Sequence, residues 1–261
     1  ELVKMNRNGI EMQRFSEENS HAHCAFEYTY FAHPSSIIEG VNVYEVRKKI
    51  GVLLAEKFPV KDADVVIPVP DSARPAALAY AQELDIAYEE GLLKDKYRKK
   101  GSMRSFIEPH HKDRVDINKG IIPIREVIEG KHIVVIDDSI VRGTSSASIV
   151  QILRAFGAKK ISMIITYPPI RYPCYAGIDF PSQEELIAYQ QANEETSNTD
   201  IGSKVRKIIG ADYVAYNDTL NLSNAVGISS EGLCFSCSTG DYSPLGIKPI
   251  FRSRVQTKGE E

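Results

Sequence analysis

The chain has 261 residues, of which 43% are hydrophobic and 26% are charged, a composition typical of a globular protein with one sizeable core or two small domains. Its formal net charge of -3 gives no general attraction to nucleic acid or anionic lipid, so a binding site for an anion would have to be local. No apolar run approaches the roughly 18 residues that a membrane span requires, and no secretory signal is recognisable. We therefore expect a cytoplasmic protein without nucleic-acid or membrane partners.

The first predicted elements are a helix, a strand and a second helix. Asn42 followed by Glu45 is a capping pattern, and apolar residues recur at helical spacing through VYEVRKKIGVLLAEKF, which predicts an amphipathic helix over residues 43–58. The β-branched run ADVVIPVP at residues 63–70 is typical of a strand buried in a parallel sheet. It continues through the loop DSARP into the alanine-rich stretch AALAYAQELD, which predicts the second helix.

A basic segment interrupts this regular pattern. LLKDKYRKKGSMRSF at residues 92–106 is rich in lysine and arginine, contains one acidic residue and has no apolar period. These features predict a mobile basic loop, although a solvated run of charge on a surface has the same composition.

A strand, a helix and another strand follow the basic segment. KHIVVID at residues 131–137 and ISMIITYPP at residues 161–169 are predicted strands, and TSSASIVQILRAFG between them is a predicted helix that ends at Gly157. This order predicts a βαβ unit, and so an α/β fold with a parallel sheet flanked by helices. Farther along the chain, Ser182 and Glu185 form a second capping pattern before EELIAYQQANE, and GSKVRKIIG predicts another helical stretch.

Acidic and hydroxyl side chains follow two of the predicted strands. Ligands of open parallel sheets bind beyond the carboxyl ends of the strands, where Asp71, Ser72, Asp137 and Asp138 are expected. A single aspartate there would commonly cap the next helix. Two adjacent acids raise each other's pKa unless a cation or hydroxyl groups engage them, so the pair favours a diol or Mg²⁺. The glycine fingerprints of dinucleotide-binding and P-loop proteins are absent from these loops.

A sugar phosphate would satisfy both halves of the stretch VVIDDSIVRGTS. The Arg-Gly-Thr-Ser turn before a helix can hold the phosphate, while the two carboxylates engage ribose hydroxyls. This stretch resembles the phosphoribosyl pyrophosphate (PRPP) signature of type I phosphoribosyltransferases. The resemblance implies the type I phosphoribosyltransferase fold.

A longer resemblance covers nearly the whole chain. The blocks FEYTYFAHPSSIIEGVNVYEVRKKIG, ADVVIPVPDSARPAALAYA, GLLKDKYRKK, YPPIRYPCYAGIDFPSQEELIA and CFSCSTGDY are similar, in the same order, to glutamine PRPP amidotransferases. The resemblance implies a homo-oligomeric enzyme that transfers ammonia to C1 of PRPP. The products would be 5-phosphoribosylamine and pyrophosphate, in the first step of de novo purine biosynthesis.

The same resemblance assigns roles to individual residues. The residues implied in catalysis are Asp137, Asp138, Lys94, Tyr97 and Arg104. The residues implied in PRPP binding are Asp71, Ser72, Arg74, Asp137, Asp138, Ser139, Ile140, Val141, Arg142, Gly143 and Thr144. The residues implied as ligands of Mg²⁺ are Ser72, Asp137 and Asp138. The chain departs from the family pattern at Ala73 and Arg74, and its basic loop is longer than the family's.

The chain contains four cysteines, Cys24, Cys174, Cys234 and Cys237. Their spacing alone is compatible with two disulfides, with a metal or iron-sulfur site, or with unrelated buried thiols. The resemblance implies that the four thiolates ligate a [4Fe-4S] cluster, which would join the N- and C-terminal extensions of the core.

The similar enzymes begin with a glutaminase domain whose N-terminal cysteine is the nucleophile, and this chain has no counterpart to it. The missing initiator methionine indicates a fragment or a processed product. We expect that the glutaminase domain is either truncated or encoded separately, and that this chain alone lacks glutaminase activity. The expected division is an N-terminal segment at 1–40, a phosphoribosyltransferase core at 41–180, and a helical, cluster-binding extension at 181–261.

Two other functions share the PRPP signature. A non-catalytic PRPP-binding regulator would carry a DNA-binding domain, but the sequence contains no helix-turn-helix candidate and no basic face. A nucleobase salvage phosphoribosyltransferase would leave the four cysteines unexplained.

Overall fold

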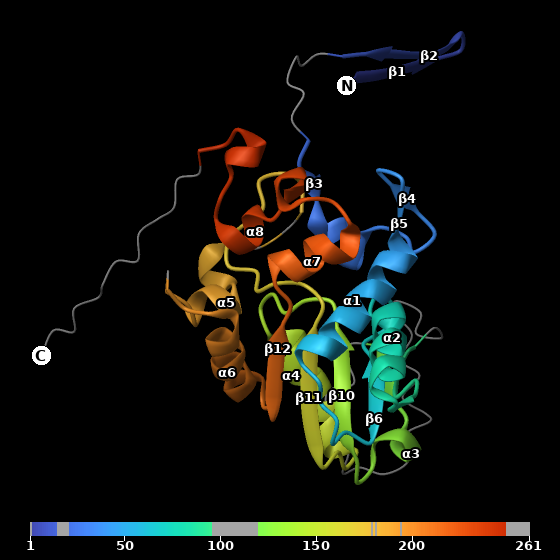
Figure 1. Ribbon diagram of the computed structural model, residues 1–261, viewed down its shortest axis with the longest axis vertical. Coiled ribbons are helices and arrows are strands. Elements are labelled where there is room, and N and C mark those ends of the chain that lie inside the picture. Colours follow the sequence, from blue (N-terminus) through green and yellow to red (C-terminus); the bar gives the residue numbers. More distant parts are fainter. Residues whose placement is uncertain are drawn as a thin grey trace, which may run out of the picture.

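The computed structural model describes residues 2–14, 21–95, 120–178, 180, 182–193 and 195–248. At its centre is a five-stranded parallel sheet with the strand order β12-β11-β10-β6-β7 (Figure 1). Its strands are β6 (Val65–Pro68), β7 (Ala87–Tyr88), β10 (His132–Asp137), β11 (Lys160–Ile165) and β12 (Tyr213–Tyr216). The predicted α/β fold with a parallel sheet is confirmed.

Helices cover both faces of the sheet. One apolar core lies between the sheet and the helices α1, α2 and α7, and a second lies between the sheet and α4 and α6. The bounds of these helices are α1 (Val43–Lys57), α2 (Arg74–Leu84), α4 (Thr144–Ala155), α6 (Asn198–Ile209) and α7 (Thr219–Val226). Side chains of β10 alternate between the cores, because Val134 faces the first and Val135 the second. Both are fully buried, which explains the continuous apolar run of this strand.

Local chemistry sets the start of α1 and its distance from α2. The Oδ1 atom of Asn42 accepts a hydrogen bond from the Glu45 amide at 3.1 Å, which confirms the predicted cap. Gly51 lies where a Cβ atom would come within 2.2 Å of the carbonyl oxygen of Ala76 on α2. The absence of a side chain at Gly51 therefore allows α1 and α2 to pack closely.

Besides the central sheet, the described residues form four two-stranded sheets, two of them at functionally relevant positions. In the first, β3 pairs in parallel with β13, which is about 200 residues away along the chain. In the second, β8 and β9 form an antiparallel pair. Residues 96–119, which separate these two strands along the chain, lie outside the described residues. The strands of the four sheets are β1 (Leu2–Asn6), β2 (Gly9–Gln13), β3 (His23–Cys24), β4 (Ile37–Ile38), β5 (Val41–Asn42), β8 (Leu92–Lys94), β9 (Ile121–Pro123) and β13 (Leu233–Cys234).

Short helical turns complete the fold. They are the π-helical turn η1 (Glu27–Phe31), the α-helical turns α3 (Arg125–Ile128), α5 (Ile187–Gln190) and α8 (Ser236–Thr239), and the 3-10 turns η2 (Gln183–Glu185), η3 (Ser230–Gly232) and η4 (Ser243–Leu245). Among the described residues, none of the helices has the length and apolar character needed to traverse a bilayer.

The structure corrects two local expectations. Leu92–Lys94, predicted as the start of a loop, form the strand β8. The predicted helix after Ser182 is broken into η2 and α5, and the hydroxyl of Ser182 donates to the carboxylate of Glu185 at 3.2 Å instead of capping an amide. The expected boundary at residue 180 stays a prediction, while residues beyond it contribute β12 to the central sheet.

Candidate functional site

The predicted ligand loops meet at the carboxyl ends of β6 and β10. The amide of Val69, just after β6, donates to the carbonyl of Ile136 on β10 at 2.8 Å, so the two strand ends are held together. A cavity of about 950 Å³ opens there. The expected residues that line it are Asp71, Ser72, Lys94, Asp137, Asp138, Ser139, Val141, Arg142, Gly143 and Thr144.

Asp137 and Asp138 form a largely buried pair of carboxyl groups. Oδ2 of Asp138 accepts from the hydroxyl of Ser72 at 2.5 Å, and its Oδ1 accepts from the hydroxyl of Ser139 at 2.8 Å. Burial raises the pKa of Asp137 well above its ordinary value, and the charge of Asp138 raises it further. Burial also raises the pKa of Asp138, although the hydrogen bonds from the two serines oppose that change. The pair is therefore suited to bind hydroxyl groups or a hard cation.

The turn between Asp138 and α4 combines a helix N-terminus with hydroxyl side chains. Gly143 precedes the helix with φ of +80°, a conformation that favours glycine. Thr144, Ser145 and Ser148 of α4 line the cavity. The free amides of a first helical turn attract anions, so this turn is suited to a phosphate group. Ile140 differs from the expectation, because it is buried in the core and does not line the cavity within the described part of the chain.

Residues of the C-terminal region support this turn. The amide of Ile187 donates to the carbonyl of Val141 at 2.9 Å, and Nε of Arg142 lies 2.8 Å from the carboxylate of Glu185. A Cβ atom at Gly143 would lie 2.6 Å from Cδ1 of Ile187. Glycine at this position is therefore favoured by the backbone conformation, and a larger residue would also require the Ile187 side chain to shift.

Asp71 gathers two basic side chains beside the acidic pair. Nζ of Lys94 lies 2.6 Å from one oxygen of Asp71, and Nη1 of Arg74 lies 2.6 Å from the other. Arg74 also binds Glu90 through Nε at 3.1 Å and, in the described part of the structure, does not line the cavity. Lys94 does line it, so the structure brings Lys94 to the predicted site while Arg74 is held by Glu90. The other two expected catalytic residues, Tyr97 and Arg104, lie outside the described residues.

Aromatic side chains that sequence reasoning did not select also line the cavity. We call this group the aromatic wall, and it consists of Phe26, Tyr30, Phe31 and Phe180. The rings of the other three pack against Phe26, with centroids 5.2 to 5.8 Å from that of Phe26. Tyr30 and Phe31 are 46% and 52% exposed, whereas Phe26 is buried. The block FEYTYFAHP, with four aromatic residues in its first six positions, carries a signal for such a wall.

Arg47 of α1 is a second lining residue that was missed. It is only 3% exposed, and its guanidinium donates to three backbone carbonyls of the segment that carries Tyr30 and Phe31 of the aromatic wall. Burial lowers the pKa of Arg47, and the charge of Asp138 opposes this effect. A buried cation therefore lies near the acidic pair.

The four cysteines gather in a different part of the molecule. Cys24 on β3 and Cys234 on β13 are register partners in neighbouring strands. The carbonyl of Cys237 accepts from the amides of Arg171 and Tyr172, which bring the segment before Cys174 to the same place. All four thiols are free. The disulfide alternative therefore does not hold for this structure.

The electrostatics of the thiols also indicate that they lie close together. The pKa of Cys24 is raised to about 11, chiefly by burial and in smaller part by the neighbouring Cys234 and Cys174, while hydrogen bonds from backbone amides oppose the shift. Burial raises the pKa of Cys237 to about 12, and the three other thiols contribute to the shift. Within the described ranges, no three His, Cys, Asp or Glu side chains are grouped to hold a single metal ion. A four-iron cluster binds one thiolate on each iron, so its ligands stand farther apart than those of one ion.

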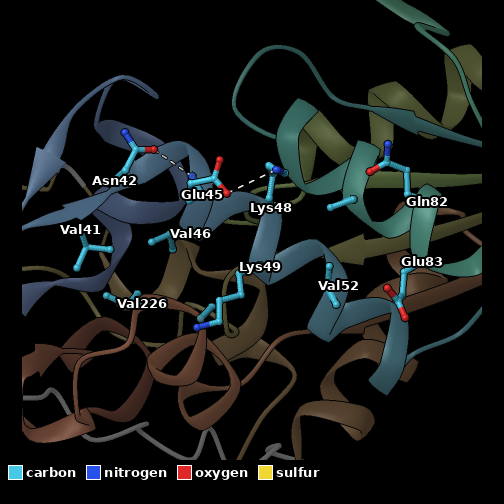
Figure 2. A pocket seen from close by; sticks show the side chains of 12 residues that line it. Val41, Asn42, Glu45, Val46, Lys48, Lys49, Val52, Gln82, Glu83 and Val226 are labelled. Atoms are coloured by element: carbon cyan, nitrogen blue, oxygen red, sulfur yellow. Dashed lines mark hydrogen bonds and ion pairs between the residues drawn. The ribbon is translucent and has the colours of Figure 1, made fainter.

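A second cavity lies between α1, α2 and α7 and has a volume of about 530 Å³. Figure 2 shows Lys48 of α1 turned toward Glu45 in this groove, with Gln82 and Glu83 on the facing helix α2. Nζ of Lys48 lies 3.5 Å from the carboxylate of Glu45. The groove has no counterpart of the buried acidic pair, so we place the candidate site in the cavity at the strand ends.

Comparison with known sequences is consistent with this position. Residues 44–176 match the family described as the phosphoribosyl transferase domain. The chain is 42% identical over 247 residues to an amidophosphoribosyltransferase of Methanothermobacter thermautotrophicus, covering 94% of this chain and 49% of the relative. It is 40% identical to the amidophosphoribosyltransferase of Bacillus subtilis, covering 93% and 49%. The chloroplastic amidophosphoribosyltransferase 2 of Arabidopsis thaliana is 41% identical, with coverages of 100% and 43%.

Solved structures give the same result. The chain superposes with a TM-score of 0.75 and 39% identity on a structure of the allosteric regulatory enzyme of purine biosynthesis, covering 92% of this chain and 50% of that one. It matches glutamine PRPP amidotransferase from Bacillus subtilis, complexed with ADP and GMP, at the same TM-score and identity, covering 92% and 51%. The chain thus spans about half the length of the relatives it matches.

Proposed function

This chain belongs to the phosphoribosyl transferase domain family and is related over most of its length to amidophosphoribosyltransferases, and on that premise we propose that it transfers ammonia to C1 of PRPP. The lone pair of ammonia forms the new C1–N bond while the C1–O bond to pyrophosphate breaks. Pyrophosphate leaves with the bonding electrons, and the nitrogen loses a proton to solvent. The product is 5-phosphoribosylamine, and the place of the reaction would be the first step of de novo purine biosynthesis.

One observation carries the proposal, namely the contact between a buried acidic pair and an anion-binding turn in a single cavity. Asp137 and Asp138 are suited to hold the ribose 2- and 3-hydroxyls, and residues 139–144 are suited to wrap the 5-phosphate. The two half-sites adjoin along the chain, so one sugar phosphate can occupy both. The negative charge of the pair also favours the positive charge that develops on the ribose as the C1–O bond breaks.

The leaving pyrophosphate requires cationic and hydroxyl groups near C1. Lys94 and Ser72 line the same cavity, and Nζ of Lys94 is held by Asp71 in this structure. We infer that Lys94 exchanges Asp71 for pyrophosphate oxygens when PRPP binds, with Tyr97 and Arg104 contributing from the basic loop. Binding of these groups to the departing charge would lower the barrier to breaking the C1–O bond.

The oxygen donors at the site fit a divalent cation. Asp137, Asp138 and Ser72 present carboxylate and hydroxyl oxygens, the ligands that Mg²⁺ prefers, and Mg²⁺ commonly takes one or two protein carboxylates together with substrate oxygens and water. When bound, Mg²⁺ would neutralise negative charge on the pyrophosphate.

The four gathered thiols fit an iron-sulfur cluster. Cys24, Cys174, Cys234 and Cys237 are free, come from three distant segments and influence one another electrostatically. We propose that they hold a [4Fe-4S] cluster, which would supply a structural cross-link between these segments and no redox step. The amide of Ala176 donates to Sγ of Cys174 at 3.3 Å, a contact that could also stabilise a cluster ligand.

We propose that the complete enzyme also includes a source of ammonia. The chain spans about half the length of its relatives, and we propose that a glutaminase domain, in the same or a separate polypeptide, supplies ammonia. Homo-oligomerisation and a cytoplasmic location belong to the same proposal. The division of the chain at residues 40 and 180 is also proposed, with β12 completing the core from beyond the second boundary.

Pyrophosphate release tests the function directly. The chain should release pyrophosphate from PRPP and Mg²⁺ when ammonia is added, and should not do so when adenine, guanine or orotate replaces ammonia. Release that depended on one of these bases would identify a salvage phosphoribosyltransferase. PRPP binding without release under any of these conditions would identify a regulator.

A further inference from the structure

We propose that Arg47 is a positioning residue that fixes the aromatic wall beside Asp138 and thereby keeps water away from C1 of PRPP. This inference rests on the proposed function and concerns the same cavity. It assigns to α1, which contributes none of the expected site residues, control over the choice between ammonia and water.

The hydrogen bonds of Arg47 are directed at one segment. Nε donates to the carbonyl of Tyr28 at 3.0 Å, and Nη2 donates to the carbonyls of Tyr30 at 3.1 Å and Ala32 at 2.8 Å. These carbonyls belong to the last turn of η1 and the residue that follows it, where carbonyls lack partners within a helix. The side chain of Arg47 therefore holds the end of η1 in place.

This anchor matters because Tyr30 and Phe31, the exposed residues of the wall, lie on the backbone segment whose carbonyls Arg47 binds. Tyr30 and Phe31 are about half exposed and contact Phe26 and each other, with 5.0 Å between their own ring centroids. Their position depends on the backbone that Arg47 holds. A shift of that backbone would open the apolar lining of the site to water.

The planar geometry of the guanidinium explains why lysine cannot replace arginine at position 47. Three carbonyls are bound by two nitrogens of a planar fork, an arrangement that a lysine ammonium on a flexible stem does not reproduce. Within the described ranges, the hydrogen bonds of Arg47 use only Nε and Nη2, and the side chain also lines the cavity. Its charge and that of Asp138 stabilise each other. Arg47 thus connects the aromatic wall to the acidic pair.

Water exclusion is the expected consequence. PRPP carries an activated C1, so water that reaches the site competes with ammonia and releases the same pyrophosphate. The ratio of ammonia-independent to ammonia-dependent pyrophosphate release measures this competition. A residue needed only for folding would change the amount of active protein and both rates together, and would leave the ratio unchanged.

The test compares Arg47→Lys with Lys48→Met in the full chain with Mg²⁺ and PRPP. Lys48 is the next residue of the same helix and turns into the groove of Figure 2. Arg47→Lys should raise the ratio of hydrolysis to transfer about tenfold, because small misplacements at a reacting centre have effects of that order or larger. Lys48→Met should leave the ratio unchanged.

Further results would distinguish a failure of this inference from a failure of the proposed function. An unchanged ratio in folded Arg47→Lys would overturn this inference while leaving the proposed function intact. If Arg47→Lys does not fold, Phe31→Ala, which removes a wall side chain and keeps Arg47, should raise the ratio, and an unchanged ratio there would equally overturn it. If the unsubstituted chain showed no ammonia-dependent release, the proposed function and this inference would both fall.

Discussion

The hydroxyl of Ser72 donates a hydrogen bond to the carboxylate of Asp138, with 2.5 Å between Oγ and Oδ2, although 66 residues separate them along the chain. Ser72 follows β6 and Asp138 follows β10, and these strands are neighbours in the central sheet. The parallel arrangement places both carboxyl ends at one edge, so the contact is a direct product of the fold. It joins the proposed pyrophosphate-binding and ribose-binding loops into one site.

Asp138→Asn should lower ammonia-dependent turnover by roughly 100-fold, the usual effect of removing one electrostatic contact to a charge that develops in the transition state. The variant should remain folded and be at least as stable as the unsubstituted chain, because it removes one of two adjacent, largely buried carboxyl groups. Steady-state kinetics and thermal unfolding check both parts. Glu83→Gln, on the exposed surface of α2, is the matched carboxylate control, and retained turnover in Asp138→Asn would exclude the assigned role.

Gly143→Ala should weaken PRPP binding and raise the KM for PRPP. The new methyl group would meet Ile187, and the φ of +80° would cost about 1 kcal/mol for a residue with a Cβ atom. Gly227→Ala is a matched control, because Gly227 has the same φ of +80° and open space at the Cβ position. Gly143→Ala should lose at least as much stability in urea unfolding as Gly227→Ala, but only Gly143→Ala should raise the KM. Equal KM values in the two variants would mean that the turn does not bind the phosphate.

Cys237→Ser should abolish cluster binding. The unsubstituted chain, prepared without oxygen, should contain about four iron and four sulfide per chain and absorb visible light, as expected for a [4Fe-4S] centre. Ser238→Ala changes the adjacent side chain, which is as buried as Cys237 at 8% exposure, and should retain the iron. Iron and sulfide analysis, together with absorption spectra, measures the cluster content of each variant. Full iron content in Cys237→Ser, or none in the unsubstituted chain, would contradict the proposed cluster.

Asp212→Asn should reduce stability at neutral pH and flatten its fall in acid. Burial alone would raise the pKa of Asp212, but hydrogen bonds from the Ile161 amide at 2.6 Å and from Arg154 at 2.5 Å outweigh burial and hold the pKa below its ordinary value. A depressed pKa in the folded state stabilises the fold above the unfolded-state pKa near 4, and this contribution is lost as pH falls through the folded pKa. Urea unfolding between pH 7 and 3 measures it, with exposed Glu231→Gln as control. Parallel pH profiles for Asp212→Asn and the unsubstituted chain would rule out this contribution.

The elements predicted from sequence are those governed by local signals. The cap at Asn42, the apolar run of β10 and the turn before Thr144 were all predicted, because capping chemistry, burial on both faces of a sheet and helix-start amides are encoded in short stretches. The interrupted helix around Leu186 was not, because its extended backbone accompanies tertiary contacts. The amide of Ile187 binds the carbonyl of Val141, a partner 46 residues away that no local pattern reveals.

The site residues that were not predicted from the sequence also depend on tertiary contacts. Arg47 lies on the buried stripe of α1 between Val43 and Ile50, and a charged residue on an apolar stripe was an available signal. Its carbonyl partners could not be read from the sequence, because they depend on the position of η1 against α1. The pairing of Cys24 with Cys234 likewise follows from the register of β3 and β13. Spacing alone left the role of the cysteines open, and only the resemblance indicated a shared ligand.

Formation of the C1–N bond is the most direct test of the account. PRPP labelled with ¹³C at C1 is incubated with the chain, Mg²⁺ and ¹⁵N-labelled ammonia, and the C1 resonance is followed by NMR. A new C1 signal split by coupling to ¹⁵N should appear together with pyrophosphate, and should form roughly 100-fold more slowly in Asp138→Asn. A C1 signal of free ribose 5-phosphate alone, without coupling to nitrogen, would show hydrolysis in place of transfer and would contradict the account.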